Sequence, residues 1–363
     1  MAPIRRPNTK RTFRVAVIGF GHGGAVFHAP LIAATEGLDV AAVVTSSPER
    51  RSRARQAYPQ ATLYSNVDEL WRDATQYDLA VIGTPNSTHV PLGIAAMQAG
   101  LPAVIDKPLA PTVVDAERLL AVSRQTGLML TVFQNARWSN AFRTVRRLLS
   151  EDLVGPVLRF EARAERFRPV PRPGAWRERG EITEAGGLLY DLGSHLIDQA
   201  LVLFGAPVRV YAELERRRPG TQVDDDTFVA LTFASGVIAH LWMSYVVRLP
   251  GTALCLVGLT GTYVQPTIDP QEVALREGQR PGESGWGTVS REHWGTLSSD
   301  AEGVHRVVPL QMEPGAYQEF YAGVRAALAT GAPPPVDPKD AIDTLRVIEA
   351  AQRSASHGAV IHL

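Results

Sequence analysis

The stretch Phe13-Arg14-Val15-Ala16-Val17-Ile18-Gly19-Phe20-Gly21-His22-Gly23-Gly24 determines the fold of the first half of the chain. Its apolar first six residues predict a buried strand, and Gly19, Gly21 and Gly24 follow at G-x-G-x-x-G spacing. In this pattern the glycines permit a tight turn, close approach of a pyrophosphate to the backbone, and packing of the next helix. With Phe20 between the glycines and a helix expected over about residues 24–35, the stretch predicts a dinucleotide-binding turn rather than a turn without a ligand.

The residues after this turn alternate between strand and helix patterns. Strands are predicted over residues 40–45, around 63, and over 79–82, 103–105 and 128–133. Helices are predicted over residues 48–58, 67–73, 91–99 and 113–126. This alternation is typical of a doubly wound parallel sheet of the Rossmann type, in which the ligand lies over the carboxyl ends of the strands. We therefore assign residues 1–134 to a dinucleotide-binding domain.

The end of the second predicted strand bears on the choice of cofactor. An NAD-specific site usually carries an acidic residue there, which holds the ribose 2′-hydroxyl. Here Thr45, Ser46 and Ser47 stand in that place, and Glu49 and Arg50 follow. Hydroxyl groups can donate to a 2′-phosphate and Arg50 can neutralise it, so the sequence favours NADP over NAD. The alternatives are that the arginine belongs to a solvated helix face and that Glu49 reaches the ribose.

Two further strand ends carry polar side chains. Thr84-Pro85-Asn86 and His89 follow the fourth strand, where a loop would pass over the nicotinamide half of a dinucleotide. Lys107, between Asp106 and Pro108, follows the fifth strand and is expected to point into the ligand crevice. Its ammonium can hold a substrate hydroxyl and stabilise an oxyanion. The alternative is an exposed lysine with a structural role.

A helix in the second half of the chain brings acid/base groups together. Apolar residues at helical spacing predict this helix over about residues 188–204. Asp191, His195 and Asp198 are spaced to lie along one of its sides. A carboxylate one turn from an imidazole can orient it and hold its pKa near neutral, as a general acid/base requires. A structural pair and a metal site are the alternatives, but further ligands at metal spacing are missing, so we predict no metal.

The remainder of the second half predicts an α+β domain, which we assign to residues 135–363. Strands are expected over residues 157–166, 208–214, 227–233, 237–244 and 253–258, and helices over 141–150, 317–330 and 339–356. Short turns between consecutive strands favour a mostly antiparallel open sheet. Residues 280–305 are rich in glycine and serine and predict a loop. The sheet face away from the central helix would be apolar, so we expect a second copy to cover it in a homodimer or homotetramer.

The segment of residues 166–179 is rich in arginine and proline. Arg166, Trp176 and Arg177 in this segment could hold hydroxyl groups and cover the face of a sugar-like substrate. The alternative is a surface loop without a ligand.

Four motifs together resemble the Gfo/Idh/MocA oxidoreductases, a family named after glucose–fructose oxidoreductase and inositol dehydrogenase. They are Gly19-x-Gly21-x-x-Gly24, Thr84-Pro85-Asn86-x-x-His89, Asp106-Lys107-Pro108 and Asp191-x-Gly193-x-His195-x-x-Asp198. The resemblance implies a catalytic role for Lys107, and contacts of Asp191 and His195 with the substrate. It also implies an NAD(P)-dependent enzyme that transfers a hydride between a nicotinamide and a hydroxyl-bearing carbon.

Further motifs are similar to the subgroup that contains NADP-dependent scyllo-inositol dehydrogenases. They are Phe27-His28-Ala29-Pro30, Phe133-Gln134-Asn135-Ala136-Arg137-Trp138, Arg166-Phe167-Arg168-Pro169 and Leu189-Tyr190-Asp191-Leu192. This similarity implies a cyclic polyol substrate and adds Asn135, Arg137 and Trp138 to the candidate substrate-binding residues. Asp106 replaces the commoner glutamate of the family, and Asn135 stands where the subgroup would have histidine. A non-catalytic, nucleotide-sensing regulator and a dehydrogenase of another sugar are the alternative functions.

Composition narrows the class of protein further. The chain has 363 residues, a length that suggests about two domains, and it contains 37 basic and 37 acidic residues. This balance gives no indication of a nucleic-acid partner. The single Cys255 cannot form an internal disulfide, which favours the reducing cytoplasm. The basic residues 5–14 lack the apolar core of a signal peptide, and no stretch approaches the roughly 20 apolar residues of a membrane span.

Overall fold

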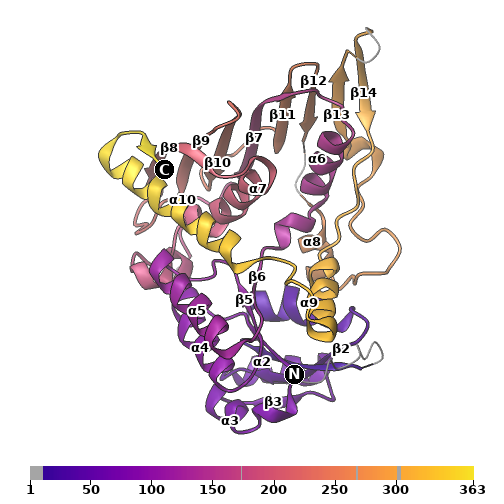
Figure 1. The fold of residues 1–363 in the computed structure, drawn as a ribbon, viewed down its shortest axis with the longest axis vertical. Coiled ribbons are helices and arrows are strands. Elements are labelled where there is room, and N and C mark those ends of the chain that lie inside the picture. The colour runs from indigo at the N-terminus through magenta and orange to yellow at the C-terminus, as the bar shows by residue number, and fades with distance from the viewer. Residues whose placement is uncertain (1–10, 173, 267–268, 301–303) are drawn as a thin grey trace, which may run out of the picture.

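The computed structural model describes residues 11–172, 174–266, 269–300 and 304–363, and it contains two sheets (Figure 1). The predictions made for residues 1–10, and for parts of the segments 166–179 and 280–305, lie outside the described residues. Among the helices of the described residues, none is long and apolar enough to cross a membrane.

The first sheet is parallel and has the strand order β3-β2-β1-β4-β5-β6. Its strands are β1 (Phe13–Ile18), β2 (Leu38–Val44), β3 (Thr62–Tyr64), β4 (Leu79–Ile82), β5 (Ala103–Asp106) and β6 (Leu130–Phe133). Strands β1, β4 and β5 are short apolar runs with almost every residue buried, as expected for a parallel sheet with both faces covered. The doubly wound order confirms the predicted Rossmann-type fold.

Helices cover this sheet, and one of them differs from the prediction. They are α1 (Ala29–Ala33), α2 (Pro48–Ala57), α3 (Val67–Arg72), α4 (His89–Gln98) and α5 (Val113–Thr126), with short turns η2 (Ala74–Gln76) and η3 (Asn86–Thr88). The predicted α-helix over residues 24–35 begins instead with a π-helical segment, η1 (Gly23–His28). Pro30 lacks the N–H that would bond Val26 in an α-helix, so this segment loses one regular hydrogen bond.

The second sheet has nine strands in the order β14-β13-β12-β11-β7-β10-β9-β8-β15. They are β7 (Val157–Glu165), β8 (Pro207–Glu215), β9 (Asp226–Phe233), β10 (Ile238–Ser244), β11 (Leu254–Gly258), β12 (Gly261–Gln265), β13 (Gly295–Ser299), β14 (Arg306–Leu310) and β15 (Ile361–His362). Only the β7–β10 pair among these strands is parallel, which confirms the mostly antiparallel open sheet.

The prediction of a loop over residues 280–305 is wrong at its end, because β13 lies within it. Gly295–Ser299 contains one buried leucine, Leu297, among glycine, serine and threonine. Its strand conformation depends on pairing with β12 on one side and β14 on the other, which are contacts that a local pattern does not contain.

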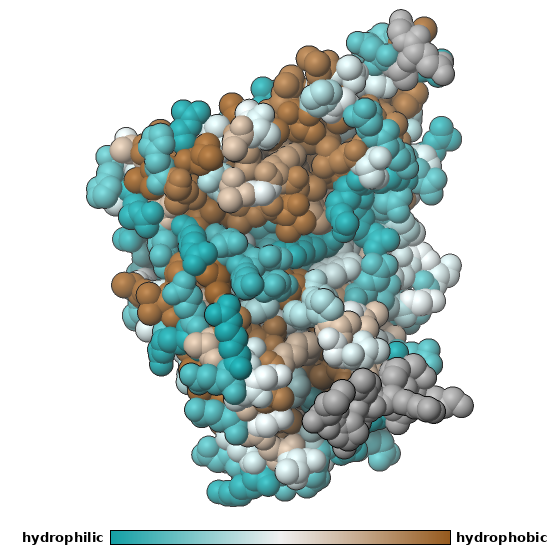
Figure 2. Space-filling model, viewed as in Figure 1, coloured by the Kyte–Doolittle hydropathy of each residue, from teal (hydrophilic) through white to brown (hydrophobic). Residues whose placement is uncertain are grey.

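Some helices of the second half cover one face of this sheet, and others reach back to the first domain. They are η4 (Asn135–Trp138), α6 (Asn140–Ser150), η5 (Trp176–Glu178), η6 (Ile182–Glu184), η7 (Leu189–Gly193), α7 (Ser194–Phe204), α8 (Gln271–Arg276), η8 (Arg291–His293), α9 (Gln318–Thr330) and α10 (Pro338–His357). α7 and α10 pack on the strands (Figure 1), while Tyr321 of α9 bonds His28 of η1 at 2.6 Å. Figure 2 shows a hydrophilic band across the middle of the molecule and apolar residues above it, where Figure 1 places α7.

A buried ion pair joins the elements that meet between the two sheets. Arg137 of η4 donates to both carboxylate oxygens of Asp198 in α7, at 2.7 and 2.8 Å, and to Asp340 of α10 at 2.9 Å. The Asp198 side chain is 1% exposed. Arg137 therefore ties η4, α7 and α10 together through a carboxylate that water does not reach.

Replacing Arg137 with alanine is expected to lower the free energy of unfolding by about 3–5 kcal/mol, because Asp198 would keep a buried charge without a partner. Chemical denaturation measures this change. The control is Arg346→Ala, which removes an exposed guanidinium from Glu117 and Asp343 and should cost less than about 1 kcal/mol. Equal losses from the two variants would contradict the structural role of Arg137.

Candidate active site

A cavity of about 620 Å³ lies between the two domains. Residues from both halves of the chain line it, among them His22, Gly23, Asp106, Lys107, Asn135, Arg166, Trp176, Arg177, Asp191, His195, Tyr245 and Glu272. The cavity thus extends from the glycine-rich turn to the helix that carries Asp191 and His195. It meets the first sheet beyond the carboxyl end of β5, where a parallel sheet binds ligands.

The glycine-rich turn has the close packing that the sequence predicts. A Cβ atom on Gly24 would lie 1.9 Å from the carbonyl oxygen of Gly19, so only glycine fits there. Gly19 itself has φ +91°, in the left-handed region. Phe20 is buried, whereas Gly21 leaves open space, and the nearest atom to a Cβ there is Nη1 of Arg50, at 3.8 Å. The turn therefore leaves room for a pyrophosphate beside a guanidinium.

The start of α2 explains how Arg50 comes to lie over this turn. The Ser47 side chain accepts a hydrogen bond from the Arg50 backbone at 3.3 Å, and Pro48 occupies the first helical position. Thr45 is buried and Ser46 is exposed. Since Ser47 caps the helix, Ser46 and Arg50 are the groups in this segment that remain free to meet a 2′-phosphate.

The loop after β4 is held by its own side chains. The hydroxyls of Thr84 and Thr88 lie 2.6 Å apart, and Pro85 is exposed. The Asn86 amide is buried and donates to the carbonyls of Glu184 and Ala185, so it binds the loop of the second domain.

His89 does not take the cofactor-binding position that the sequence suggests. Its side chain is completely buried, and its ring nitrogens lie 2.8 Å from the Pro108 carbonyl and 3.0 Å from the Thr84 carbonyl. Both nitrogens are thus occupied by the backbone, and His89 fixes the two strand-end loops to each other.

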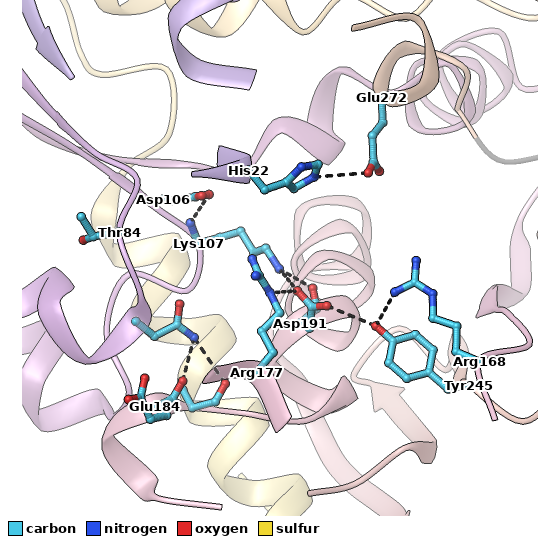
Figure 3. A network of polar contacts seen from close by, with 12 residues as sticks. His22, Thr84, Asp106, Lys107, Arg168, Arg177, Glu184, Asp191, Tyr245 and Glu272 are labelled. Atoms are coloured by element: carbon cyan, nitrogen blue, oxygen red, sulfur yellow. Dashed lines mark hydrogen bonds and ion pairs between the residues drawn. The ribbon is translucent and has the colours of Figure 1, made fainter. Parts of the chain in front are cut away.

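Lys107 and Asp191 form an ion pair between the two domains (Figure 3). The Lys107 Nζ donates to Oδ1 of Asp191 at 3.0 Å and also to the Asp191 backbone carbonyl. Only 11% of the lysine side chain is exposed. Burial opposes ionisation of Asp191, but the adjacent Lys107 and Arg177 outweigh it and hold the carboxyl pKa below its usual range. The Asp191 carboxylate is therefore ionised at neutral pH.

A π-helical turn positions Asp191. The turn η7 begins after Gly187, which has φ +91° and lies against Asp224: a Cβ there would be 1.9 Å from Oδ1 of Asp224. The other Asp224 oxygen accepts a hydrogen bond from the Leu189 backbone at 2.7 Å. The predicted single α-helix over residues 188–204 is thus a π-helical turn followed by α7. π-Helical segments are frequent at functional sites.

His195 lies on the cavity but is not oriented by Asp191, contrary to the prediction. Among the hydrogen bonds of the described residues, none joins the two side chains, because the carboxylate is taken by Lys107 and Arg177. Burial and the Lys107 ammonium lower the pKa of His195 to about 3, so the expectation of a near-neutral value is wrong. Nδ1 is buried and has no hydrogen-bond partner among the described residues, which leaves Nε2 as the nitrogen available to a ligand.

The segment around Trp176 and Arg177 closes the cavity on the side of the second domain. Nε of Arg177 lies 3.2 Å from Asp191, and its guanidinium stacks on Trp176 with 4.1 Å to the ring centre. Glu178 is held by Arg218, whose guanidinium is 2% exposed. The loop is therefore anchored by a buried cation next to the residue that reaches Asp191.

Three of the predicted neighbours lie away from the cavity. Arg137 is bound to Asp198 and Asp340, and Asp198 is buried in that pair rather than aligned with His195. Trp138 packs edge-on against Phe320, with 5.6 Å between ring centres. None of these side chains lines the cavity, so the structure gives them supporting roles, whereas Asn135 and Arg166 do line it.

Tyr245 and Glu272 are among the cavity residues that the sequence analysis missed. Tyr245 directs its hydroxyl at Oδ2 of Asp191, at 3.5 Å, and lies under Arg168 (Figure 3). Its place directly after the predicted strand 237–244 was the available signal. Glu272 lies opposite His22, in a part of the chain for which the sequence predicted no element. Among the described residues no group of three or more His, Cys, Asp and Glu side chains could hold a metal ion.

Comparison with known proteins identifies the class. The model described as "Oxidoreductase family, NAD-binding Rossmann fold" matches residues 13–134, and "Oxidoreductase family, C-terminal alpha/beta domain" matches residues 146–363; both belong to Gfo/Idh/MocA. The uncharacterized oxidoreductase YdgJ of Escherichia coli K12 is 39% identical over 96% of this chain and 98% of its own.

Matches from Bacillus subtilis, in sequence and in structure, extend the comparison. The protein named scyllo-inositol 2-dehydrogenase (NADP(+)) IolW is 31% identical over 97% of this chain and 96% of its own. The structure of the putative oxidoreductase yvaA superposes with a TM-score of 0.92 at 30% identity, over 99% of this chain and all of the other. The chain therefore belongs to the Gfo/Idh/MocA family and is an oxidoreductase with an NAD(P)-binding Rossmann domain.

Proposed function

We propose that this enzyme transfers a hydride between NADP and a hydroxyl-bearing carbon of a cyclic polyol, with an inositol such as scyllo-inositol as the first candidate. The observation that carries the proposal is the group Lys107, Asp191 and His195 on one cavity next to the glycine-rich turn. A cation, a carboxylate and a neutral imidazole can together bind and deprotonate a hydroxyl group. The name of IolW, an inositol dehydrogenase, supports the choice of substrate.

His195, Lys107 and Asp191 each have a separate role in the proposed reaction. Bound NADP would supply the hydride acceptor at the nicotinamide. His195, neutral because of its low pKa, takes the proton of the reacting hydroxyl at Nε2 as the carbonyl forms. Lys107 holds the same oxygen and stabilises the negative charge that develops on it. Asp191 fixes Lys107 and accepts a hydrogen bond from a neighbouring hydroxyl.

The preference for NADP over NAD rests on the end of β2. There is no carboxylate at Thr45, Ser46 or Ser47 to hold a ribose 2′-hydroxyl, and the Arg50 guanidinium lies beside Gly21. A charge-assisted pair with a 2′-phosphate would favour NADPH by about 10- to 100-fold in affinity. Arg50→Ala is the variant that should abolish this preference, and equal affinity of the native enzyme for NADH and NADPH would exclude it.

Absorbance of the reduced nicotinamide, on mixing the enzyme with NADP or NAD and a panel of inositols and aldoses, tests the function. We expect reduction of NADP with scyllo-inositol. Reduction only with an aldose would retain the hydride chemistry and replace the substrate class by another sugar, which the arginine-rich cavity also fits. Tight binding of cofactor without turnover of any polyol or sugar would instead favour a nucleotide-sensing regulator.

His195→Ala is expected to lower kcat by about 10²- to 10⁴-fold, because a positioned general base contributes about that much. The dissociation constant of NADPH, followed by fluorescence, should not change. Near-native turnover would remove His195 from the mechanism. His293→Ala is the matched control, since that histidine is exposed and lies outside the cavity lining.

The same assignment fixes the pH dependence of oxidation. With a pKa of about 3, His195 is already deprotonated at and above pH 5, so its state of protonation does not change across the neutral range. Plotted against pH, kcat/KM for the polyol should therefore show no acid inflection from this residue near pH 6.5. An inflection there that disappears in His195→Asn would show that the base titrates normally.

We also propose that the face of the second sheet away from α7 and α10 is covered by a second copy of the chain, in a homodimer or a tetramer built from such dimers. Phe228, His240 and Trp242 lie side by side on this face, with 5.2 Å between the Phe228 and Trp242 rings. The Arg163 guanidinium covers Trp242 at 3.8 Å. Half-exposed aromatic rings on a broad sheet are typical of an interface.

Trp242→Glu should convert the oligomer to a monomer, because it replaces an apolar ring of the proposed interface with a charged side chain that the interface would have to take out of water. Light scattering coupled to gel filtration gives the mass of the particle. Trp294→Glu serves as the control, since this residue is outside the aromatic cluster. A native mass of one chain would exclude the dimer.

A further inference from the structure

A cluster of polar side chains from both domains lines the cavity beside the glycine-rich turn. His22 stands inside the turn, between Gly21 and Gly23. Its Nε2 lies 3.5 Å from Oε1 of Glu272 and 3.4 Å from an Nη of Arg276, both on α8 of the second domain. Figure 3 shows His22 and Glu272 facing each other across this gap. All three side chains line the cavity together with Gly23.

The cluster is held from both sides. The His22 ring packs edge-on against Phe27, with 5.4 Å between centres. Glu272 pairs with Arg276 one helical turn away, and α8 lies against η1. The contact with His22 lowers the pKa of Glu272, and the charge of Arg276 adds to this effect. Together they outweigh burial, which raises the pKa, and bring it to about 2, so the carboxylate is ionised. Glu272 thus fixes the direction of a guanidinium that is still half exposed to the cavity.

The turn itself, residues 19–24, contains no lysine or arginine. A dinucleotide diphosphate carries two negative charges, against which the N–H groups at the start of the helix supply only partial charges. Arg50 lies by Gly21, at the adenosine side of the turn, where it is expected to meet a 2′-phosphate. Arg276 lies beside His22 and, like Gly23, lines the cavity. It therefore lies on the side of the turn that continues into the cavity.

We infer that Arg276 is a cofactor-binding residue contributed by the second domain, which pairs with the cofactor diphosphate while Glu272 and His22 hold it over the glycine-rich turn. This inference rests on the proposed use of a nicotinamide dinucleotide. It assigns a second function to α8, because the domain that forms the substrate side of the cavity also closes over the cofactor. Cofactor binding would then reinforce the existing contact between α8 and η1.

Equilibrium binding, rather than turnover, tests this role. Arg276→Ala should raise the dissociation constant of NADPH about 10- to 100-fold, the usual effect of losing a charge-assisted hydrogen bond. 2′-Phospho-ADP-ribose, which keeps the diphosphate but lacks the nicotinamide, should lose the same factor. Adenosine 2′-monophosphate lacks the diphosphate, and its affinity should not change. The salt dependence of NADPH binding should become weaker in the variant.

Two variants control for other effects of the substitution. Arg291→Ala removes an exposed arginine of the same domain that does not line the cavity, and it should bind NADPH as the native enzyme does. Arg276→Lys keeps the positive charge and should recover part of the affinity. Thermal unfolding of the ligand-free variants shows whether each retains the native fold; Arg276 is half exposed, so its loss should leave the midpoint within a few degrees.

The outcomes separate the two proposals. If the native enzyme binds NADPH and Arg276→Ala binds it equally well, the inference is wrong and the proposed function stands. If Arg276→Ala weakens adenosine 2′-monophosphate as much as NADPH, the effect is not directed at the diphosphate and the inference is also wrong. If the native enzyme binds neither NADP nor NAD, the proposed cofactor fails, and the assignment of Arg276 fails with it.

Discussion

The ion pair between Lys107 and Asp191 is the interaction on which the candidate site depends. It joins the carboxyl end of β5 in the first sheet to the π-helical turn η7 of the second domain. Removing one partner of a buried ion pair lowers the stability of the protein, because the other charge is left unpaired. Each charge therefore constrains the position of the other. The geometry of the cavity follows: Arg177 and Tyr245 approach the same carboxylate, and His195 is left without a carboxylate partner.

Residues that do not touch Lys107 hold the Asp191 side of this ion pair in place. Asp224 holds the start of η7, and Gly187 is required because a side chain there would collide with the Asp224 carboxylate. The next residue, Asp225, binds the buried Arg218, which in turn holds Glu178 beside Arg177. Asp224 therefore positions the turn that carries Asp191, and the adjacent Asp225 positions the loop that carries Arg177.

Much of this could be predicted from the sequence where the information is local. The first sheet follows from apolar runs and turns, and Lys107 from its place at a strand end. Strands β12 to β14 were not found, because they are short runs interrupted by glycine, serine or proline, and they become strands by pairing with β11 and with one another. Glu272 and Arg276 were missed for a similar reason: they join the site only because α8 packs against the turn at residues 19–24.

The prediction that Asp191 orients His195 was wrong for a physical reason. Helical spacing alone suggested that Asp191 would orient the imidazole, but a carboxylate binds the strongest donors within reach, and here those are a lysine and an arginine from other segments. Once Asp191 is taken, His195 lies beside the Lys107 cation in a buried place, and protonation becomes unfavourable. The histidine is thereby kept neutral, with an unprotonated ring nitrogen facing the cavity, and it is a weaker base than a free imidazole. The lysine that holds the reacting oxygen in the proposed mechanism thus also keeps the base deprotonated, so one cation serves both requirements of hydride removal from an alcohol.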